Sequence, residues 1–345
     1  MTAKATKKKS SAKNAEEPTP ATETAPTGEP TPSPPPEARP TSKTPKKKFD
    51  LNKLIDAIFT SLGPDAPSGS AKVRDDLVRA YIQSQIENNP LAKSYNILIL
   101  HDEGRMVKRD ADNIYSASEA FTDKRPVMLV LYSTGGVIGS AYLIGKLCRE
   151  YADEKFIVVV PRQAKSAATL ICCAADEIHM GSLSEIGPID PQIDDLPALG
   201  LKTSVEHIAD LIKAYPQASD MFAKYLNMSL KPIHLGYYER VAESAAQYAE
   251  RLLNLHPLHL KRKPAEIAKT LVYSYKDHGF VIDKVEASEI FGDNVIQTDT
   301  EEYKLGNSIY AALMFVARVA NAVNHYFYFI GSLSSDPHFS KRGRN

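Results

Sequence analysis

Hydrophobic residues change their spacing along the chain in a way that predicts an α/β fold. Between residues 51 and 82 they recur every three or four positions, which is the period of helices with one buried face. Three short runs of consecutive apolar residues have the length of buried strands: 95–100, 127–132 and 156–160. Segments of helical length separate these runs, near 109–122 and 137–152. Buried strands that alternate with helices indicate a mainly parallel sheet covered on both faces.

The second half of the chain has a mainly helical pattern. We expect helices near 203–228, 236–254 and 264–275, and a short strand at 294–297. Asp283 and Glu286 have the spacing of a helix start signal, so another helix should begin there and end near Gly292. The stretch 303–330 is predicted to be one long apolar-rich helix. Its polar residues are too frequent for a membrane span, so it should pack in the core or in an oligomer interface.

The first 48 residues differ from the rest in composition. They hold ten of the 23 prolines and no Val, Ile, Leu, Phe or Tyr, so burial cannot offset the entropy cost of ordering them. Ten basic and five acidic side chains give this segment a charge of about +5. We therefore expect a disordered Lys- and Pro-rich tail, either a solvating linker or an electrostatic tether. The predicted parts of the chain are the tail at 1–48, N-terminal helices at 49–90, an α/β domain at 91–300 with a helical insertion at about 203–275, and a C-terminal helix and tail at 301–345.

Composition and charge exclude several classes of protein. The 345 residues contain 42 basic and 42 acidic side chains, so the chain is neither a globally basic nucleic-acid binder nor a polyacidic one. Three cysteines, two of them adjacent, do not suit a disulfide framework and are typical of reduced thiols. No apolar stretch fits a secretory signal or a membrane span, so we expect a soluble, cytoplasmic protein without a transmembrane segment.

Two strand-to-helix turns concentrate the residues that suggest chemistry. The first contains Gly135 and Gly136, whose backbone can turn sharply and expose its N–H groups to a phosphate or an oxyanion. The Walker-type and dinucleotide-binding glycine patterns are absent. The second turn contains Ser166, directly before a run of small apolar residues that begins at Ala167. Ser166 is an ordinary helix cap or a nucleophile whose acyl group would lie between the two turns.

A rigid loop follows the second turn and completes a recognisable set of motifs. The loop reads G-P-I-D-P-Q from Gly187 to Gln192, and its prolines exclude a helix. Together with the S-x-G-G turn and the serine in a small-residue helix start, it resembles the serine dehydrogenase proteinase family, a branch of the ClpP/crotonase-like serine peptidases. The resemblance covers 95–192 and returns at 276–295.

The resemblance implies a fold of repeated ββα units and a role for each matching residue. Ser166 is the implied nucleophile, with Asp190 as the acid and His278 as the base of a triad in the chain order Ser, Asp, His. The implied oxyanion donors are backbone N–H groups from three residues: Gly135, Gly136 and Ala167. An imidazole can take the serine proton, and a carboxylate fixes the imidazole tautomer and stabilises its charged form.

Other residues remain alternatives for the base. His101 ends a predicted strand, where the active sites of parallel sheets gather. Lys165 adjoins Ser166 and suits a Ser-Lys mechanism if its amine is neutral. His256 and His259 have a spacing that can ligate a metal, but no carboxylate or cysteine partner accompanies them, so we expect neither a metal nor a cofactor.

Three functions remain open from the sequence. The first is a serine peptidase that acts on peptides or unfolded protein. The second is a catalytically inactive ClpP-like scaffold for assembly or binding, because no histidine occupies the ClpP-like position after Ser166. The third is an acyl-CoA enzyme of the crotonase type, which shares the oxyanion hole but needs no serine nucleophile. The resemblance also implies a homo-oligomer, and no nucleic-acid partner is expected for the core.

Overall fold

The main strands of the computed structural model form one sheet in the order β11-β10-β1-β2-β3-β5-β9. The structure describes residues 49–343 except 194–195, 198–199 and 230, so the predicted tail at 1–48 lies outside the described residues. The strands are β1 Asn96–Asp102, β2 Val127–Ser133, β3 Phe156–Val160, β5 Glu177–Met180, β9 Ile296–Thr298, β10 His325–Ser332 and β11 His338–Lys341. From β1 to β9 the neighbours in this order are parallel, whereas β10 and β11 are antiparallel to theirs. The predicted mainly parallel α/β fold is confirmed.

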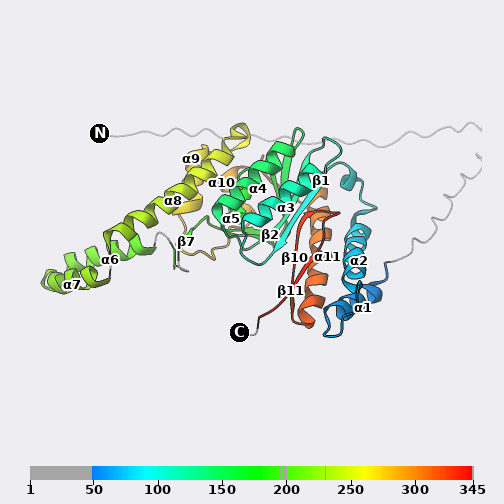
Figure 1. Ribbon diagram of the computed structural model, residues 1–345. Helices are drawn as coiled ribbons and strands as arrows, with labels where there is room; N and C mark the ends of the chain where they lie inside the picture. The colour runs from blue at the N-terminus through cyan, green and yellow to red at the C-terminus, as the bar shows by residue number, and fades with distance from the viewer. Residues whose placement is uncertain (1–48, 194–195, 198–199, 230, 344–345) are drawn as a thin grey trace, which may run out of the picture. The chain divides into compact units, whose positions relative to one another are not determined.

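Helices cover both faces of the sheet (Figure 1). The first face packs against α3 Lys108–Glu119, α4 Ile138–Tyr151, α5 Ala167–Cys172, α8 Pro232–Leu253, α9 Pro264–Tyr273 and α10 Lys284–Phe291; the second packs against α1 Leu51–Leu62, α2 Ser70–Ile86 and α11 Glu301–Ala322. Alternate residues of β1 show this division, because Leu98 and Leu100 belong to the first core and Ile97 and Ile99 to the second. Burial on both faces explains why the central strands are continuous apolar runs.

Two very short strands extend the sheet at the carboxyl ends of its central strands. β4 Gln163–Ala164 pairs with β2 through Ala164 and Ser133, and β6 Glu185–Ile186 pairs with β4. Ile186 also forms an antiparallel bridge with Ile282. These pairings bring the turn after β4, the loop after β6 and the segment around residue 280 to the same edge of the sheet.

The C-terminal region differs from the prediction of one helix over 303–330. α11 ends at Ala322, and Asn324 adopts a φ of 58°, a left-handed conformation that Asn tolerates. The following aromatic-rich residues form β10, which pairs with β1, and then β11. The helical pattern did not reveal this change because apolar residues continue through it. The consecutive aromatic residues 326–329 of β10 are typical of a strand. The C-terminal helix and tail assigned to 301–345 is therefore corrected to a helix followed by two strands of the main sheet.

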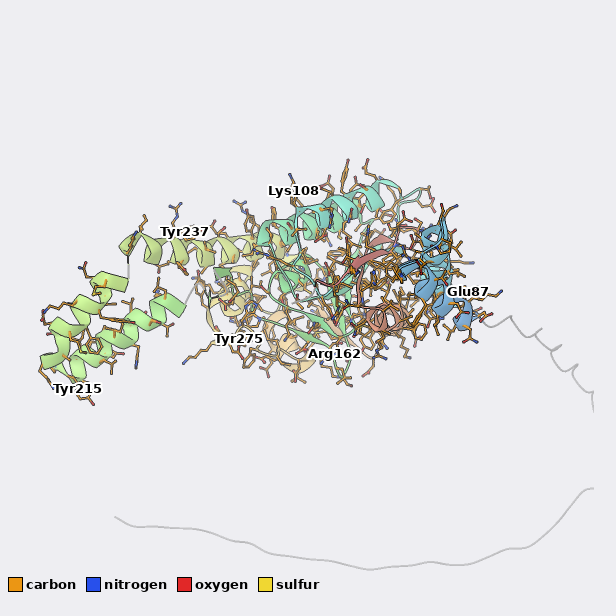
Figure 2. All side chains as sticks on the ribbon, turned by 60° about the horizontal axis from the view of Figure 1, so that its bottom comes forward. Glu87, Lys108, Arg162, Tyr215, Tyr237 and Tyr275 are labelled. Carbon is orange, nitrogen blue, oxygen red and sulfur yellow. The ribbon has the colours of Figure 1, made fainter. Side chains whose placement is uncertain are left out.

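The region predicted to be a helical insertion contains helices, but the first predicted helix, near 203–228, is split. α6 Gly200–Ala214 and α7 Ser219–Ser229 are separated by a short 3-10 turn that begins at Pro216, which lacks the N–H needed to continue a helix. Among the described residues of α6 none is buried. Tyr215, which follows α6, and Tyr237 in α8 are also exposed; both are labelled in Figure 2. None of the helices that the structure describes is long and apolar enough to span a membrane.

Candidate active site

Two consecutive glycines form the sharp turn at the end of β2. Gly135 and Gly136 have φ angles of 102° and 150°, which side-chain-bearing residues rarely adopt. The turn is fixed on one side by Met106, whose N–H donates to Gly135 O at 2.8 Å and whose carbonyl accepts from Val137 N at 2.9 Å. A Cβ on Gly136 would overlap the Met106 backbone. The sequence therefore needs glycine at both positions, for conformation and for close packing.

The structure brings this turn against Ser166. A Cβ built on Gly135 would lie 2.9 Å from Ser166 Cβ and 3.0 Å from Ala167 N. The pairing of β4 with β2 produces this proximity, because both strands end at the same edge of the sheet. The two turns that were predicted to cooperate are thus direct neighbours.

Ser166 has an unusual backbone conformation for a residue with a side chain. Its φ is 51° and its ψ is −119°, outside the regions that such residues normally occupy. Its side chain forms no capping hydrogen bond to α5, so the interpretation as an ordinary helix cap is not supported. Backbone strain of this kind costs about 1–3 kcal/mol and clusters at functional sites. Within the described part of the chain, the half-buried Ser166 hydroxyl has no hydrogen-bond partner.

Backbone N–H groups from both turns are available to a ligand. The N–H of Gly135 donates to Ser133 Oγ at 3.1 Å, so this group is already used. For Gly136 and Ala167, the described residues provide no acceptor for the backbone N–H. Of the three predicted oxyanion donors, Gly136 and Ala167 therefore have the free donors, while Gly135 supplies the space next to Ser166.

Asp190 and His278 lie together, although 88 positions separate them in the sequence. Asp190 Oδ2 is 3.5 Å from His278 Nδ1, and the side chains are 11% and 36% exposed. Asp190 stabilises the protonated imidazole and thereby raises the pKa of His278 above its ordinary value, against the opposing effect of partial burial. Asp190 Oδ1 is buried and has no partner among the described residues. The pair that the resemblance implied is therefore present as a carboxylate–imidazole contact.

Gln192 is a member of this cluster that the sequence did not single out. Its Nε2 lies 2.9 Å from Asp190 Oδ2 and 3.1 Å from His278 Nδ1. The amide therefore donates to Asp190 Oδ2 and holds this carboxylate beside the imidazole. Gln192 is the last residue of the G-P-I-D-P-Q motif, so its place in that motif was the available signal.

Hydrogen bonds tie the segments that carry these groups to the helix after Ser166. Thr169 Oγ1 in α5 lies 2.7 Å from Ala164 O and 2.8 Å from Gly187 O, so its single hydroxyl proton has two acceptors within reach. Lys165 Nζ lies 3.0 Å from Phe280 O, two residues beyond His278. The histidine-bearing segment therefore adjoins the serine turn, but no hydrogen bond joins Ser166 to His278 in the described chain.

The two alternative bases lie in settings that do not suit this role. His101 is fully enclosed, and its ring contacts Tyr132, Tyr310 and Phe327 on the face covered by α11. Burial lowers the pKa of His101 to about 3. Lys165 is bound to acceptors away from Ser166, including Glu185 Oε2 at 3.0 Å. We therefore do not assign either residue as the base.

The remaining candidate groups are structural in character. His256 is buried and its Nε2 lies 2.8 Å from Cys173 O, so it does not form a metal pair with His259. Burial raises the pKa of the Cys172 thiol to about 12, as expected for an inert thiol. In the portion of the chain that the structure describes, no cluster of His, Cys, Asp or Glu has the arrangement of a metal site.

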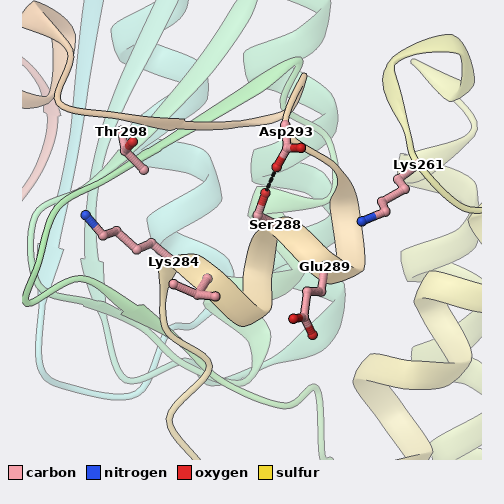
Figure 3. Close-up of a pocket in the computed structure, with 7 residues that line it drawn as sticks. Lys261, Lys284, Ser288, Glu289, Asp293 and Thr298 are labelled. Carbon is pink, nitrogen blue, oxygen red and sulfur yellow. Dashed lines mark hydrogen bonds between the residues drawn. The ribbon is translucent and has the colours of Figure 1, made fainter. Parts of the chain in front are cut away.

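A surface hollow beside α10 lies apart from these groups (Figure 3). It has a volume of about 370 Å³, and its lining includes Lys261, Lys284 and Ser288. None of the residues predicted for the active site lines it. The hollow therefore contributes no evidence about the chemistry at Ser166.

Comparison with known families bears on the central segment. Residues 105–216 match the model of the ClpP-like SDH-type serine proteinases. This segment is similar to that family. It contains the diglycine turn, Ser166 and the G-P-I-D-P-Q loop, whereas His278 lies outside the matched residues.

Individual relatives are distant or uncharacterized. Two uncharacterized proteins of Methanocaldococcus jannaschii are 28% and 33% identical to the chain, over 57% and 27% of its length. The alignments span 63% and 31% of those relatives, so the chain covers less than two thirds of either one. Two solved structures of the 1510-N membrane-bound stomatin-specific protease, a serine-to-alanine mutant and a lysine-to-alanine mutant with a substrate peptide, have 14% identity and TM-scores of 0.38 and 0.37. Both cover 61% of this chain, and the matches cover 83% and 78% of theirs.

Proposed function

We propose that this protein is a serine peptidase that hydrolyses peptide bonds through an acyl-enzyme on Ser166. The observation that carries the proposal is the conformation of Ser166, whose positive φ presents an unbonded hydroxyl beside the diglycine turn. A sharp strand-to-helix turn of this kind exposes the nucleophile in other hydrolases. The similarity of residues 105–216 to a serine proteinase family supports the same reaction class.

His278 is the proposed general base, and Asp190 its partner. Because Nδ1 faces Asp190, Nε2 is the atom that receives the proton of Ser166. Ser166 Oγ then bonds to the peptide carbonyl carbon, the C–N bond breaks, and the proton passes to the leaving amine. Water, deprotonated by the same imidazole, cleaves the ester and regenerates the serine. The hydrogen bond between Ser166 and His278 should form when substrate binds, because catalytic hydrogen bonds often tighten only in the substrate complex.

The N–H groups of Gly136 and Ala167 are the proposed oxyanion donors. They have no acceptors in the described chain and belong to the two turns that meet at Ser166. The negative oxygen of the tetrahedral intermediate would accept from both, and losing one such donor typically costs about 10²–10³ in rate. Gly135 serves this arrangement by leaving room for Ser166.

A catalytically inactive ClpP-like scaffold is the second candidate. One observation favours it: Ser166 and His278 are not hydrogen-bonded to each other within the described residues. The peptidase and the scaffold differ in whether Ser166 attacks a peptide bond.

Cleavage of an unfolded protein tests the proposal. We expect the wild type and Ser308→Ala, a serine control on α11, to cleave reduced casein, and Ser166→Ala to lose activity by at least about 10³-fold. Release of new amino termini, followed with fluorescamine, measures this. Equal cleavage by Ser166→Ala and wild type contradicts the nucleophile assignment, and inactivity of all three folded proteins favours the scaffold.

We further propose a homo-oligomer in a reducing, cytoplasm-like compartment. α6 is amphipathic in sequence, yet none of its described residues is buried within one chain. The three cysteines are free and buried, which suits reducing conditions. Light scattering on the purified full chain tests the assembly: a mass above the 38.0 kDa of one chain is expected, and a monomer at micromolar concentration contradicts it.

A further inference from the structure

Lys165 directly precedes the proposed nucleophile, but its side chain extends to a separate, nearly closed site. The side chain is 12% exposed. Its Nζ lies 3.0 Å from Glu185 Oε2, 3.4 Å from Ile186 O and 3.0 Å from Phe280 O. A protonated amine has three N–H donors, and here each one has an oxygen within reach. The site therefore suits an ammonium ion that links its surroundings, and it leaves no lone pair directed at Ser166.

The path of the lysine side chain explains the glycine of the G-P-I-D-P-Q motif. A Cβ on Gly187 would lie 2.7 Å from Lys165 Cδ and 3.5 Å from Lys165 Cα. Gly187 N also donates to Ala164 O at 3.2 Å, which holds the loop against β4. The absence of a side chain at Gly187 therefore leaves the space through which Lys165 passes.

Glu185 fixes the ammonium from the other side. Its carboxylate, on a side chain that is 10% exposed, contacts Lys165 through Oε2 and Arg162 Nη1 through Oε1 at 2.9 Å. A buried carboxylate with two cationic partners is satisfied, whereas removal of one cation would leave it undercompensated. The Lys165 position is thus determined by a network rather than by a single exposed ion pair.

The third acceptor belongs to the segment that carries His278. Phe280 O is bound by Lys165, and Ile282 exchanges two backbone hydrogen bonds of 3.0 Å with Ile186. The rings of Phe280 and Tyr275 lie 4.8 Å apart between centroids. The segment is therefore anchored just after His278, and the lysine is the anchor that is nearest in sequence to Ser166.

We propose that Lys165 is a positioning residue for the histidine. It acts as a cation that binds segment 278–282 to the β4–β6 pair, and so keeps His278 against Asp190. This inference rests on the proposed function for its catalytic consequence, but the placement of His278 is measurable without turnover.

Loss of the anchor changes the surroundings of the imidazole in a predictable direction. The charged groups that act on His278 are Asp190, which faces Nδ1, and Asp277, its neighbour in sequence. Both favour the protonated ring, so the pKa of His278 is raised. If the segment moves away from Asp190, the pKa should fall toward its ordinary value of about 6.5. A general structural defect elsewhere would not produce this change.

The experiment compares Lys165→Met, Lys165→Arg and Gly187→Ala with Lys284→Met, a lysine control on α10. NMR titration of the His278 ring in the full chain, assigned by comparison with His278→Gln, gives its pKa. We expect a lower pKa and a roughly 10²-fold lower kcat for Lys165→Met, because a displacement of about 1 Å can cost that much. Gly187→Ala keeps the Lys165 ammonium group but displaces the aliphatic part of the lysine side chain. It should therefore also lower the His278 pKa and kcat. Lys165→Arg should recover part of each effect, and Lys284→Met should match the wild type.

Each result decides the proposal. It is overturned if folded Lys165→Met keeps the wild-type His278 pKa, whatever its activity. That result, combined with inactive Lys165→Met and Lys165→Arg and an active His278→Gln, would identify Lys165 as the base. If the wild type proves inactive, the peptidase proposal fails, while a lowered His278 pKa in both Lys165→Met and Gly187→Ala still supports the positioning role.

Discussion

Replacement of Gly135 by alanine tests the close approach of the two turns. The new Cβ would lie 2.7 Å from Lys165 O, 2.9 Å from Ser166 Cβ and 3.0 Å from Ala167 N. Two of these atoms are backbone, so relief requires movement of the serine turn itself. The φ of 102° adds strain of about 1–3 kcal/mol for any side chain. We therefore expect Gly135→Ala to lower the free energy of unfolding by about 1–3 kcal/mol.

The catalytic activity of Gly135→Ala should fall as well. A shift of Ser166 by about 1 Å is expected to reduce kcat roughly 10²-fold. Gly139→Ala is the matched control, because this glycine lies in α4 with nothing within 4 Å of a built Cβ. It should keep its activity and gain about 0.5–1 kcal/mol of stability. Peptide hydrolysis and urea unfolding measure both quantities, and a Gly135→Ala enzyme with wild-type kcat would refute the packing argument.

Three further substitutions give distinct results. Asp190→Asn should move the acid limb of the kcat/KM profile to lower pH, because the carboxylate raises the pKa of His278 and the base must be neutral; an unchanged limb would separate Asp190 from the histidine. Because the pKa of His278 is higher in the folded protein than in the unfolded chain, the Asp190–His278 pair stabilises the fold below about pH 6.5. This stabilisation is lost as the pH rises through the pKa of His278 in the folded state. Gln192→Leu should reduce kcat about tenfold, since Asp190 loses the amide donor that holds its carboxylate beside the imidazole, and unaltered steady-state kinetics would count against that role. His101→Phe should retain activity in the same peptide assay because the ring lies among aromatic side chains, and an inactive but folded variant would reinstate His101 as a candidate base.

The sequence predicted the parts of the fold that depend on local pattern. Continuous apolar runs marked the buried strands, and the alternation with helices gave the parallel sheet on which Gly135 and Ser166 become neighbours. The strand β10 was not predicted, because it forms by pairing with β1, more than 200 residues earlier in the chain. Local periodicity contains no information about such a distant partner.

Some features of the candidate site were also predictable from the sequence, whereas others depend on tertiary packing. The turn at Ser166 could be located from its strand and helix, but its positive φ follows from tertiary packing. The Asp190–His278 contact was implied by family resemblance, since no spacing rule joins two loops so far apart. Gln192 and the Lys165–Glu185 network depend on side-chain directions in the folded state, so residue type alone could not assign their contacts.

The most direct measurement of the central claim is the location of a covalent adduct. Full-length protein would be treated with a fluorophosphonate, digested and mapped by mass spectrometry. We predict one adduct per chain on Ser166, lost in Ser166→Ala and strongly slowed in His278→Gln. A folded protein that remains unmodified, or that carries the adduct on another residue, would contradict the assignment of Ser166 as an activated nucleophile.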